Sequence, residues 1–190
     1  DALFPVSQRY AWHFIGGHPM AGTERSGFEN SFGDLFAGAS MILCPEYCDD
    51  EKALKTVSDF FLEIGFGRIT LSSCAHHDEV IAFTSQLAHV VSSAYIHGRL
   101  STEYSGFSAG SFADMTRVAR LSADMWTELF FENGANLSDA IGELIDNLQK
   151  YKTALDTGDR AAMHTLLAEG NARKIESEKL STPKEGTKTC

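Results

Sequence analysis

The pattern of apolar and polar positions predicts two kinds of structure, which meet near residue 74. Before that point, short apolar runs alternate with turns. Residues 39–44 (ASMILC) predict a buried strand, and residues 68–71 (RITL) predict another. Between them, acidic residues open a segment in which apolar side chains recur at helical spacing as far as Gly65. A strand, a helix and a strand in about 35 residues indicate a βαβ crossover.

Beyond Cys74 the strand signals stop and helical spacing takes over. The first predicted helix, residues 76–97, carries one broad apolar face and, opposite it, a narrow stripe of small and polar residues. The stripe is either a solvated surface or the wall of a cleft, and the pattern alone leaves both open. The apolar face consists of Val80, Phe83, Leu87, Val90, Val91 and Ala94, and the stripe of Asp78, Ala82, Ser85, His89 and Ser92.

The rest of the chain is predicted to be helical up to a polar tail. Further helices are predicted at residues 112–120, 122–133, 138–157 and 159–180. The predicted fold class is therefore α+β: the last strands of an α/β sheet in residues 1–74 are followed by an all-helical domain in residues 75–180. Residues 181–190 (STPKEGTKTC) are polar and contain Pro and Gly, so we expect a disordered tail.

Composition and charge narrow the functional classes. The 190 residues are 43% hydrophobic and 22% charged, which suffices for a packed core in one domain, or in one domain and part of another. The net charge of −10 gives no electrostatic footprint for nucleic acid or an anionic membrane surface, although a local basic pocket for a small anion is compatible with it. No apolar stretch reaches the roughly 18–20 residues of a membrane span, and no targeting segment is visible.

Four cysteines are present, namely Cys44, Cys48, Cys74 and Cys190. They neither form a CxxC motif nor pair in a dense pattern, so we expect free thiols in a reducing compartment, which places the protein in the cytoplasm. The alternative is a metal site formed by the first three of these thiols with His76 and His77. The spacing of the first pair is unusual for structural zinc, and we expect no metal.

The densest chemical signal is the segment 16–27 (GGHPMAGTERSG), in which His18 lies between glycines and before Pro19. Residues 10–15 are rich in aromatic side chains and predict a strand that ends at this turn. Ligands of α/β sheets bind beyond the carboxyl ends of strands, and an imidazole titrates near neutral pH. His18 is therefore a candidate for proton transfer, and a histidine with only a turn role is the plainer alternative.

Two further groups are candidates for ligand contacts. Arg117 follows Asp114 by about one helical turn, so the two side chains can pair, and a guanidinium held in this way can also clamp a carboxylate. His89, in the sequence S-Q-L-A-H, lies in the polar stripe of the first long helix. No G-x-S-x-G, P-loop or H-E-x-x-H motif is present.

Several unlinked short motifs occur in an order that resembles the prephenate dehydrogenase family, including the closely similar arogenate dehydrogenases. The resemblance covers about residues 10 to 175. The motifs are HPMAGTERSG at 18–27, HD at 77–78, SQLAH at 85–89, GSFADMTRVA at 110–119, DMW at 124–126 and LFFEN at 129–133.

The resemblance implies a nucleotide-binding α/β domain, of which residues 1–74 are the C-terminal part, followed by a helical substrate and dimerisation domain in residues 75–180. It implies NAD(P)-dependent oxidative decarboxylation of prephenate to 4-hydroxyphenylpyruvate in tyrosine biosynthesis. In that reaction His18 accepts the proton of the ring hydroxyl. The expected substrate contacts are Arg117, oriented by Asp114, together with His89 and Thr23.

The sequence departs from the family pattern at three places. Gln86 stands where a His is usual, and Ser111 where a second Gly is usual. No G-x-G-x-x-G turn precedes His18. We therefore expect a fragment of a longer enzyme or one half of a split one, which binds NAD or NADP through the missing N-terminal half and is inactive alone. The preference for prephenate or arogenate, and for NAD or NADP, stays open.

A different class of function is also compatible with the sequence, namely a non-catalytic module for dimerisation or effector binding. Tyrosine is the candidate effector because it resembles the product. We expect a homodimer because five large apolar residues are nearly consecutive, point in several directions around one helix and leave surface to be covered. These residues are Met125, Trp126, Leu129, Phe130 and Phe131.

Overall fold

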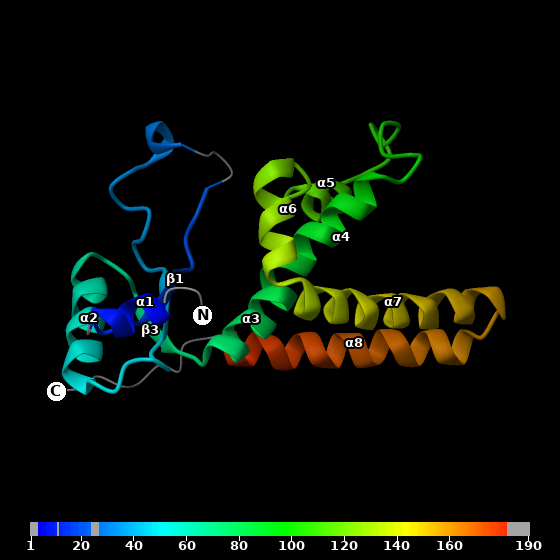
Figure 1. Ribbon diagram of the computed structural model, residues 1–190. Helices are drawn as coiled ribbons and strands as arrows, with labels where there is room; N and C mark the ends of the chain where they lie inside the picture. Colours follow the sequence, from blue (N-terminus) through cyan, green and yellow to red (C-terminus); the bar gives the residue numbers. More distant parts are fainter. Residues whose placement is uncertain (1–3, 11, 24–26, 182–190) are drawn as a thin grey trace. The chain divides into compact units, whose positions relative to one another are not determined.

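The computed structural model describes residues 4–10, 12–23 and 27–181. The chain forms two compact units, residues 1–138 and residues 139–190. The first unit contains a small sheet followed by helices, and the second contains most of a helical hairpin (Figure 1). The predicted α+β class is confirmed. The tail at residues 182–190, predicted to be disordered, lies outside the described residues.

The sheet has three strands in the order β1 (Gly16–Pro19), β2 (Ser40–Cys44) and β3 (Arg68–Leu71). β2 and β3 run parallel and are joined through a helix, so the predicted crossover is confirmed. β1 pairs antiparallel with β2 at the sheet edge. The strand predicted at residues 10–15 is wrong at the described positions, because the chain joins the sheet only at Gly16. Instead, Tyr10 stacks on Trp12, and the ring of Phe14 lies tilted against that of Tyr47.

The crossover helix α2 (Glu51–Glu63) begins at Asp50, whose carboxylate accepts hydrogen bonds from the backbone N–H groups of Lys52 and Ala53. Gly65 follows the helix with a φ of +108°, a left-handed conformation that favours glycine. The apolar side of α2 covers the sheet and closes the core of this region. The core consists of Met41, Leu43 and Phe66, with Ile15, Phe36, Ala39, Leu54, Val57, Phe61 and Ile69 packed against them.

The first long helix is not regular. It consists of α3 (Cys74–Ile81), a π-helical segment η2 (Ala82–Gln86) and α4 (Leu87–Ile96). Its burial does not follow the predicted faces, since Ala82 and Ser92 of the small-residue stripe are 1% and 2% exposed, whereas Phe83 of the apolar face is 61% exposed. The solvated interpretation of the stripe is therefore wrong at Ala82 and Ser92. A wheel at constant helical pitch does not hold across a π segment.

Two short helices cover the buried side of α4. These are α5 (Ser111–Thr116), whose Phe112 meets the ring of Tyr95, and α6 (Ala123–Glu132), whose Trp126 meets the ring of His89. The helix predicted at residues 112–120 is shorter than expected, because the chain leaves helical hydrogen bonding after Thr116. Small side chains in the stripe let these helices approach α4 closely, which accounts for the burial of Ser92.

The chain ends in two long helices, α7 (Gly134–Asp156) and α8 (Arg160–Ser181), which run side by side in opposite directions (Figure 1). Gly158, with a φ of +67°, makes the turn between them, and the Tyr151 hydroxyl donates to the carbonyl of Leu166. α7 begins four residues before the predicted start. None of the helices in the described ranges is both long and apolar enough to cross a membrane.

Candidate active site

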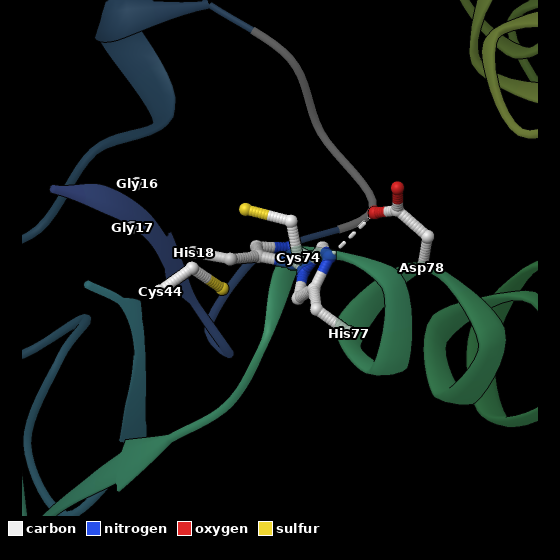
Figure 2. A pocket seen from close by; sticks show the side chains of 7 residues that line it. All are labelled: Gly16, Gly17, His18, Cys44, Cys74, His77 and Asp78. Carbon is white, nitrogen blue, oxygen red and sulfur yellow. Dashed lines mark hydrogen bonds and ion pairs between the residues drawn. The ribbon is translucent and has the colours of Figure 1, made fainter. Parts of the chain in front are cut away.

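A cavity of about 210 Å³ opens where the end of β2 and the edge strand β1 meet the first turns of α3 (Figure 2). The antiparallel pairing of β1 places Gly16 opposite Cys44 and His18 opposite Ile42. A Cβ at Gly17 would lie 2.7 Å from the Cε atom of Met41, so a larger residue there would displace the end of that side chain. The lining residues are Gly16, Gly17, His18, Cys44, Cys74, His77 and Asp78.

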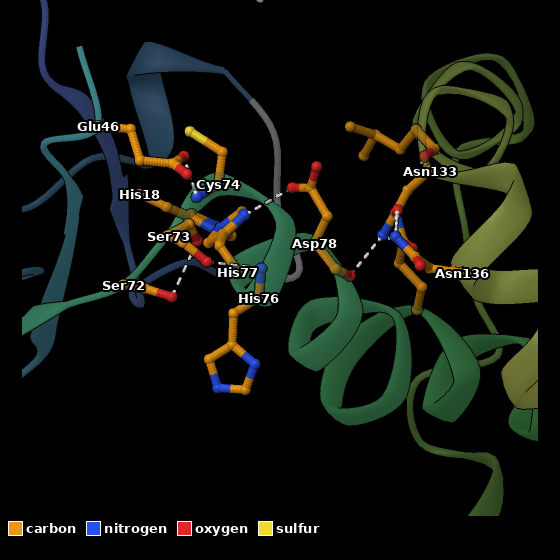
Figure 3. Close-up of polar contacts among 12 residues, drawn as sticks. His18, Glu46, Ser72, Ser73, Cys74, His76, His77, Asp78, Asn133 and Asn136 are labelled. Carbon is orange, nitrogen blue, oxygen red and sulfur yellow. Dashed lines mark hydrogen bonds and ion pairs between the residues drawn. The ribbon is translucent and has the colours of Figure 1, made fainter.

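Three side chains in this cavity form a hydrogen-bonded row. Nδ1 of His18 lies 2.9 Å from Nε2 of His77, and Nδ1 of His77 lies 2.8 Å from Oδ1 of Asp78 (Figures 2 and 3). The two imidazole rings meet edge to face, with centroids 5.1 Å apart. The side chain of His77 is 19% exposed and that of Asp78 is 54% exposed, so the row runs from the cavity towards solvent.

The environment of His18 favours its neutral form. Burial lowers the pKa of His18 below the ordinary value of 6.5, and the neighbouring His77 lowers it further. A neutral imidazole carries a lone pair at neutral pH and can take up a proton. His18, the predicted candidate for proton transfer, thus lines a cavity, and its lowered pKa favours the neutral form.

The two thiols of the cavity stay protonated. Hydrogen bonding to Glu46, together with burial, raises the pKa of Cys74 to about 12, and burial raises the pKa of Cys44. Backbone N–H of Cys74 also donates to the Glu46 carboxylate at the start of α3, where the helix dipole favours an anion. Neither thiol is therefore a ready nucleophile at neutral pH.

Free thiols are confirmed for Cys44, Cys48 and Cys74, while Cys190 lies outside the described residues. In the described ranges, no group of three or more His, Cys, Asp and Glu side chains is arranged to hold a metal ion. The alternative zinc site is therefore not formed by the described side chains.

The other predicted contact residues do not line this cavity in the described part of the chain. His89 lies on α4, where Nδ1 donates to the carbonyl of Val118 at 3.2 Å and the ring lies 4.0 Å from that of Trp126. Arg117 directly precedes Val118, so His89 and Arg117 come from adjoining segments. Asp114 is on α5, and Thr23 lies in the loop after β1. Their contacts with substrate stay predictions.

The sequence analysis missed the role of Gln86 as a structural link. Its amide Nε2 donates to the carbonyl of Leu129, and its Oε1 accepts from Nδ2 of Asn133, both at 3.0 Å. Asn133 also donates to the backbone carbonyl of Asp78 at 2.8 Å, and Asn136 donates to Asn133 (Figure 3). Gln86 is buried, so the position where the family pattern has a His is here occupied by an amide that ties η2 and α3 to the end of α6.

Comparison with known proteins identifies the family. Residues 4–71 match the family model of the prephenate dehydrogenase nucleotide-binding domain, and residues 73–169 match that of the prephenate dehydrogenase dimerization domain. The chain belongs to the prephenate dehydrogenase family, as its motifs predicted.

Characterised relatives agree with this assignment. Cyclohexadienyl dehydrogenase of Zymomonas mobilis is 38% identical over 149 residues, which are 75% of this chain and 50% of the relative. Prephenate dehydrogenase of Bacillus subtilis is 29% identical over 153 residues, which are 78% of this chain and 41% of the relative. The chain thus spans about half the length of the curated relatives it matches.

Solved structures show the same fold. Prephenate dehydrogenase from Aquifex aeolicus, in complex with hydroxyphenyl propionate and NAD+, has a TM-score of 0.78 and 30% identity, covering 92% of this chain and 62% of that one. Arogenate dehydrogenase from Synechocystis has a TM-score of 0.75 and 27% identity, covering 91% of this chain and 64% of that one. The neighbours therefore include both substrate preferences.

Proposed function

We propose that the complete protein containing this chain is an NAD(P)-dependent prephenate dehydrogenase, with arogenate as the alternative substrate. The observation that carries the proposal is the position of His18 in a cavity at the edge of an α/β sheet, hydrogen-bonded to His77, where burial lowers its pKa. Family membership supports the reaction class, and the Aquifex aeolicus neighbour holds NAD+ with a phenolic carboxylate.

The described residues fit the reacting end of such a cofactor and not its phosphates. The cavity, at about 210 Å³, is smaller than the roughly 300–1,000 Å³ of complete ligand pockets, and none of its seven described lining residues is Lys or Arg. The sequence contains no G-x-G-x-x-G turn. We therefore assign His18 and the adjoining glycines to the side facing the reacting rings. This chain alone is expected to be inactive.

When bound, NAD or NADP would supply the hydride acceptor for the carbon that carries the ring hydroxyl, and loss of carbon dioxide would make the ring aromatic. His18 accepts the hydroxyl proton, which requires its neutral form. Arg117 binds a substrate carboxylate, oriented by Asp114, and His89 contacts the substrate through Nε2, because its Nδ1 hydrogen is donated to Val118. Thr23 donates a hydrogen bond near His18.

An assay of the complete protein tests this function. We expect reduction of NAD or NADP with release of carbon dioxide when prephenate is added, and no turnover by the 190-residue chain alone. Parallel assays with arogenate and with each cofactor determine both preferences, and reactions without substrate are the control. Turnover of arogenate alone would select the alternative substrate. Tyrosine binding without turnover of either compound would instead favour the non-catalytic module.

We also propose that the helical region forms a homodimer. The matched dimerization domain supports this, and so does the apolar surface that the helices leave uncovered, on α6 (Phe131, 83% exposed) and in the second unit (Leu155, 71% exposed). Such surface favours association with a second copy. Analytical ultracentrifugation of the complete protein is expected to give twice the monomer mass at micromolar concentration, and a stable monomer would contradict the proposal.

A further inference from the structure

We propose that His77 is a positioning residue that fixes which nitrogen of His18 carries hydrogen and leaves Nε2 of His18 as the proton acceptor. The catalytic meaning of this inference rests on the proposed function, but the arrangement of hydrogens can be tested without it. The inference follows from the hydrogen-bonded row Asp78–His77–His18.

Hydrogen bonds in the row are donated in one direction only, because the carboxylate at one end can accept hydrogen bonds but not donate them. The carboxylate of Asp78, half-exposed, has acceptor oxygens and no hydrogen to donate. His77 must therefore donate from Nδ1, the atom 2.8 Å from Oδ1 of Asp78. A neutral imidazole has one donor and one acceptor nitrogen, so Nε2 of His77 is an acceptor.

The same rule then determines His18. Its Nδ1 lies 2.9 Å from Nε2 of His77, and since that atom accepts, Nδ1 of His18 must donate. The remaining nitrogen, Nε2, holds the lone pair. A row that ends in a carboxylate thus selects one tautomer of the base, as the acidic member does in hydrolase triads. The carboxylate also stabilises the positive charge that arises when His18 takes up a proton.

The backbone that carries His77 and Asp78 is held from two sides. Ser73 caps α3 by accepting from the N–H of His76, and Asn133 donates to the backbone carbonyl of Asp78 (Figure 3). Asn133 is in turn held by the buried amide of Gln86. The imidazole of His77 is largely covered. The acceptor presented to His18 is therefore fixed in place, as a positioning residue requires.

Among the described residues that line the cavity, no other titratable group replaces this function. The groups that face the cavity from the neighbouring elements are Cys44 at the end of β2, and Cys74 and Asp78 on α3, with Glu46 bound at Cys74. Both thiols have a raised pKa and stay protonated where imidazoles titrate. The charge of His18 is thus governed by burial and by His77, which both lower its pKa.

The experiment compares two replacements of His77 in the complete protein. In His77→Gln the side-chain oxygen can still accept from Nδ1 of His18, so kcat is expected to stay within a few-fold of wild type. In His77→Leu the acceptor is lost and the ring of His18 is free to turn, so kcat is expected to fall by roughly 10²-fold with little change in KM. His76→Gln and His76→Leu are the matched controls, because His76 is an exposed neighbour on the same helix that pairs with Glu79.

Two further measurements separate positioning from a merely structural role. His77 lowers the pKa of His18, so in His77→Gln that pKa is expected to rise and the acid limb of the kcat/KM profile to move to higher pH. Proton–nitrogen correlation spectra of histidine-labelled protein are expected to show hydrogen on Nδ1 of His18 in wild type and in His77→Gln, and a mixture in His77→Leu.

The outcomes are distinguishable from failure of the proposed function. If neither substrate turns over, the function fails, and the spectra still test the tautomer. Hydrogen on Nε2 of His18 in the wild-type protein would overturn the inference. Equal losses of kcat in the Gln and Leu variants, or unchanged kcat in both, would overturn it as well.

Discussion

Replacing His18 with Asn in the complete protein is expected to lower kcat by roughly 10²–10⁴-fold while changing KM little. Asn keeps a polar side chain of similar reach but cannot take up a proton at neutral pH. Since His18 lines the cavity on a strand paired with β2, the substitution leaves the surrounding fold in place. Steady-state kinetics with the preferred substrate measures the effect, and His76→Asn is the control because that imidazole is exposed and outside the cavity.

The pH dependence of the wild-type enzyme checks the same role. Because burial and His77 lower the pKa of His18, the neutral base persists below pH 6.5, and kcat/KM is expected to fall only as the pH drops through that lowered pKa. The stability of the fold depends on pH in the same direction: protonation of His18 favours the unfolded state, so its contribution is present at higher pH and is lost as the pH falls through the lowered pKa. If His18→Asn keeps near wild-type kcat, His18 has a structural role and the proposed mechanism is wrong.

The sequence predicted those strands and helices whose formation depends on residues close to one another in the chain. The crossover from β2 through α2 to β3 follows from two short apolar runs around an amphipathic segment with an acidic start. The starts of α2 and α8 are likewise local, because the carboxylates of Asp50 and Asp159 accept hydrogen bonds from backbone N–H groups of the first turn. Such features require only a few neighbouring residues, and a single sequence therefore contains them.

The misplaced strand at residues 10–15 and the inverted burial of the first long helix have non-local causes. The aromatic residues before Gly16 resemble a strand, but the pairing partner of β1 is decided by β2, more than 20 residues away. The π segment at Ala82–Gln86 rotates one half of the helix relative to the other, and no propensity marks it. Faces assigned on a regular wheel were therefore wrong at Phe83 and Ser92.

The candidate site was predictable in part for a similar reason. His18 stands out because glycines and Pro19 surround it, a local signal that is visible without the fold. Its partner His77 is 59 residues away and becomes a neighbour only when β1 joins the sheet edge beside the start of α3. The resemblance singled out the pair His77–Asp78 as a motif, but only the geometry relates it to His18.

Replacing Arg117 with Ala is expected to raise KM by roughly 10–150-fold with kcat and the melting temperature close to wild type. A hydrogen bond to a charged group is worth about 1.5–3 kcal/mol, which corresponds to that range. The reason is electrostatic, because a substrate with two carboxylates binds a chain of net charge −10 only through local cations. Arg117 supplies such a cation beside Val118, whose carbonyl accepts a hydrogen bond from the imidazole of His89.

Arg120→Ala is the matched control for this prediction, because Arg120 is an exposed arginine only three residues further on. The Arg120→Ala and Arg117→Ala variants have the same net charge. Arg117→Lys retains the charge but not the planar pair of donors, so KM should lie between wild type and Arg117→Ala. Substrate titration with kinetic readout and a thermal melt of each variant separate the two roles. An unchanged KM with a lower melting temperature, reproduced by Asp114→Ala, would assign Arg117 to a structural pair. A raised KM that Arg120→Ala does not share would assign it to the substrate carboxylate.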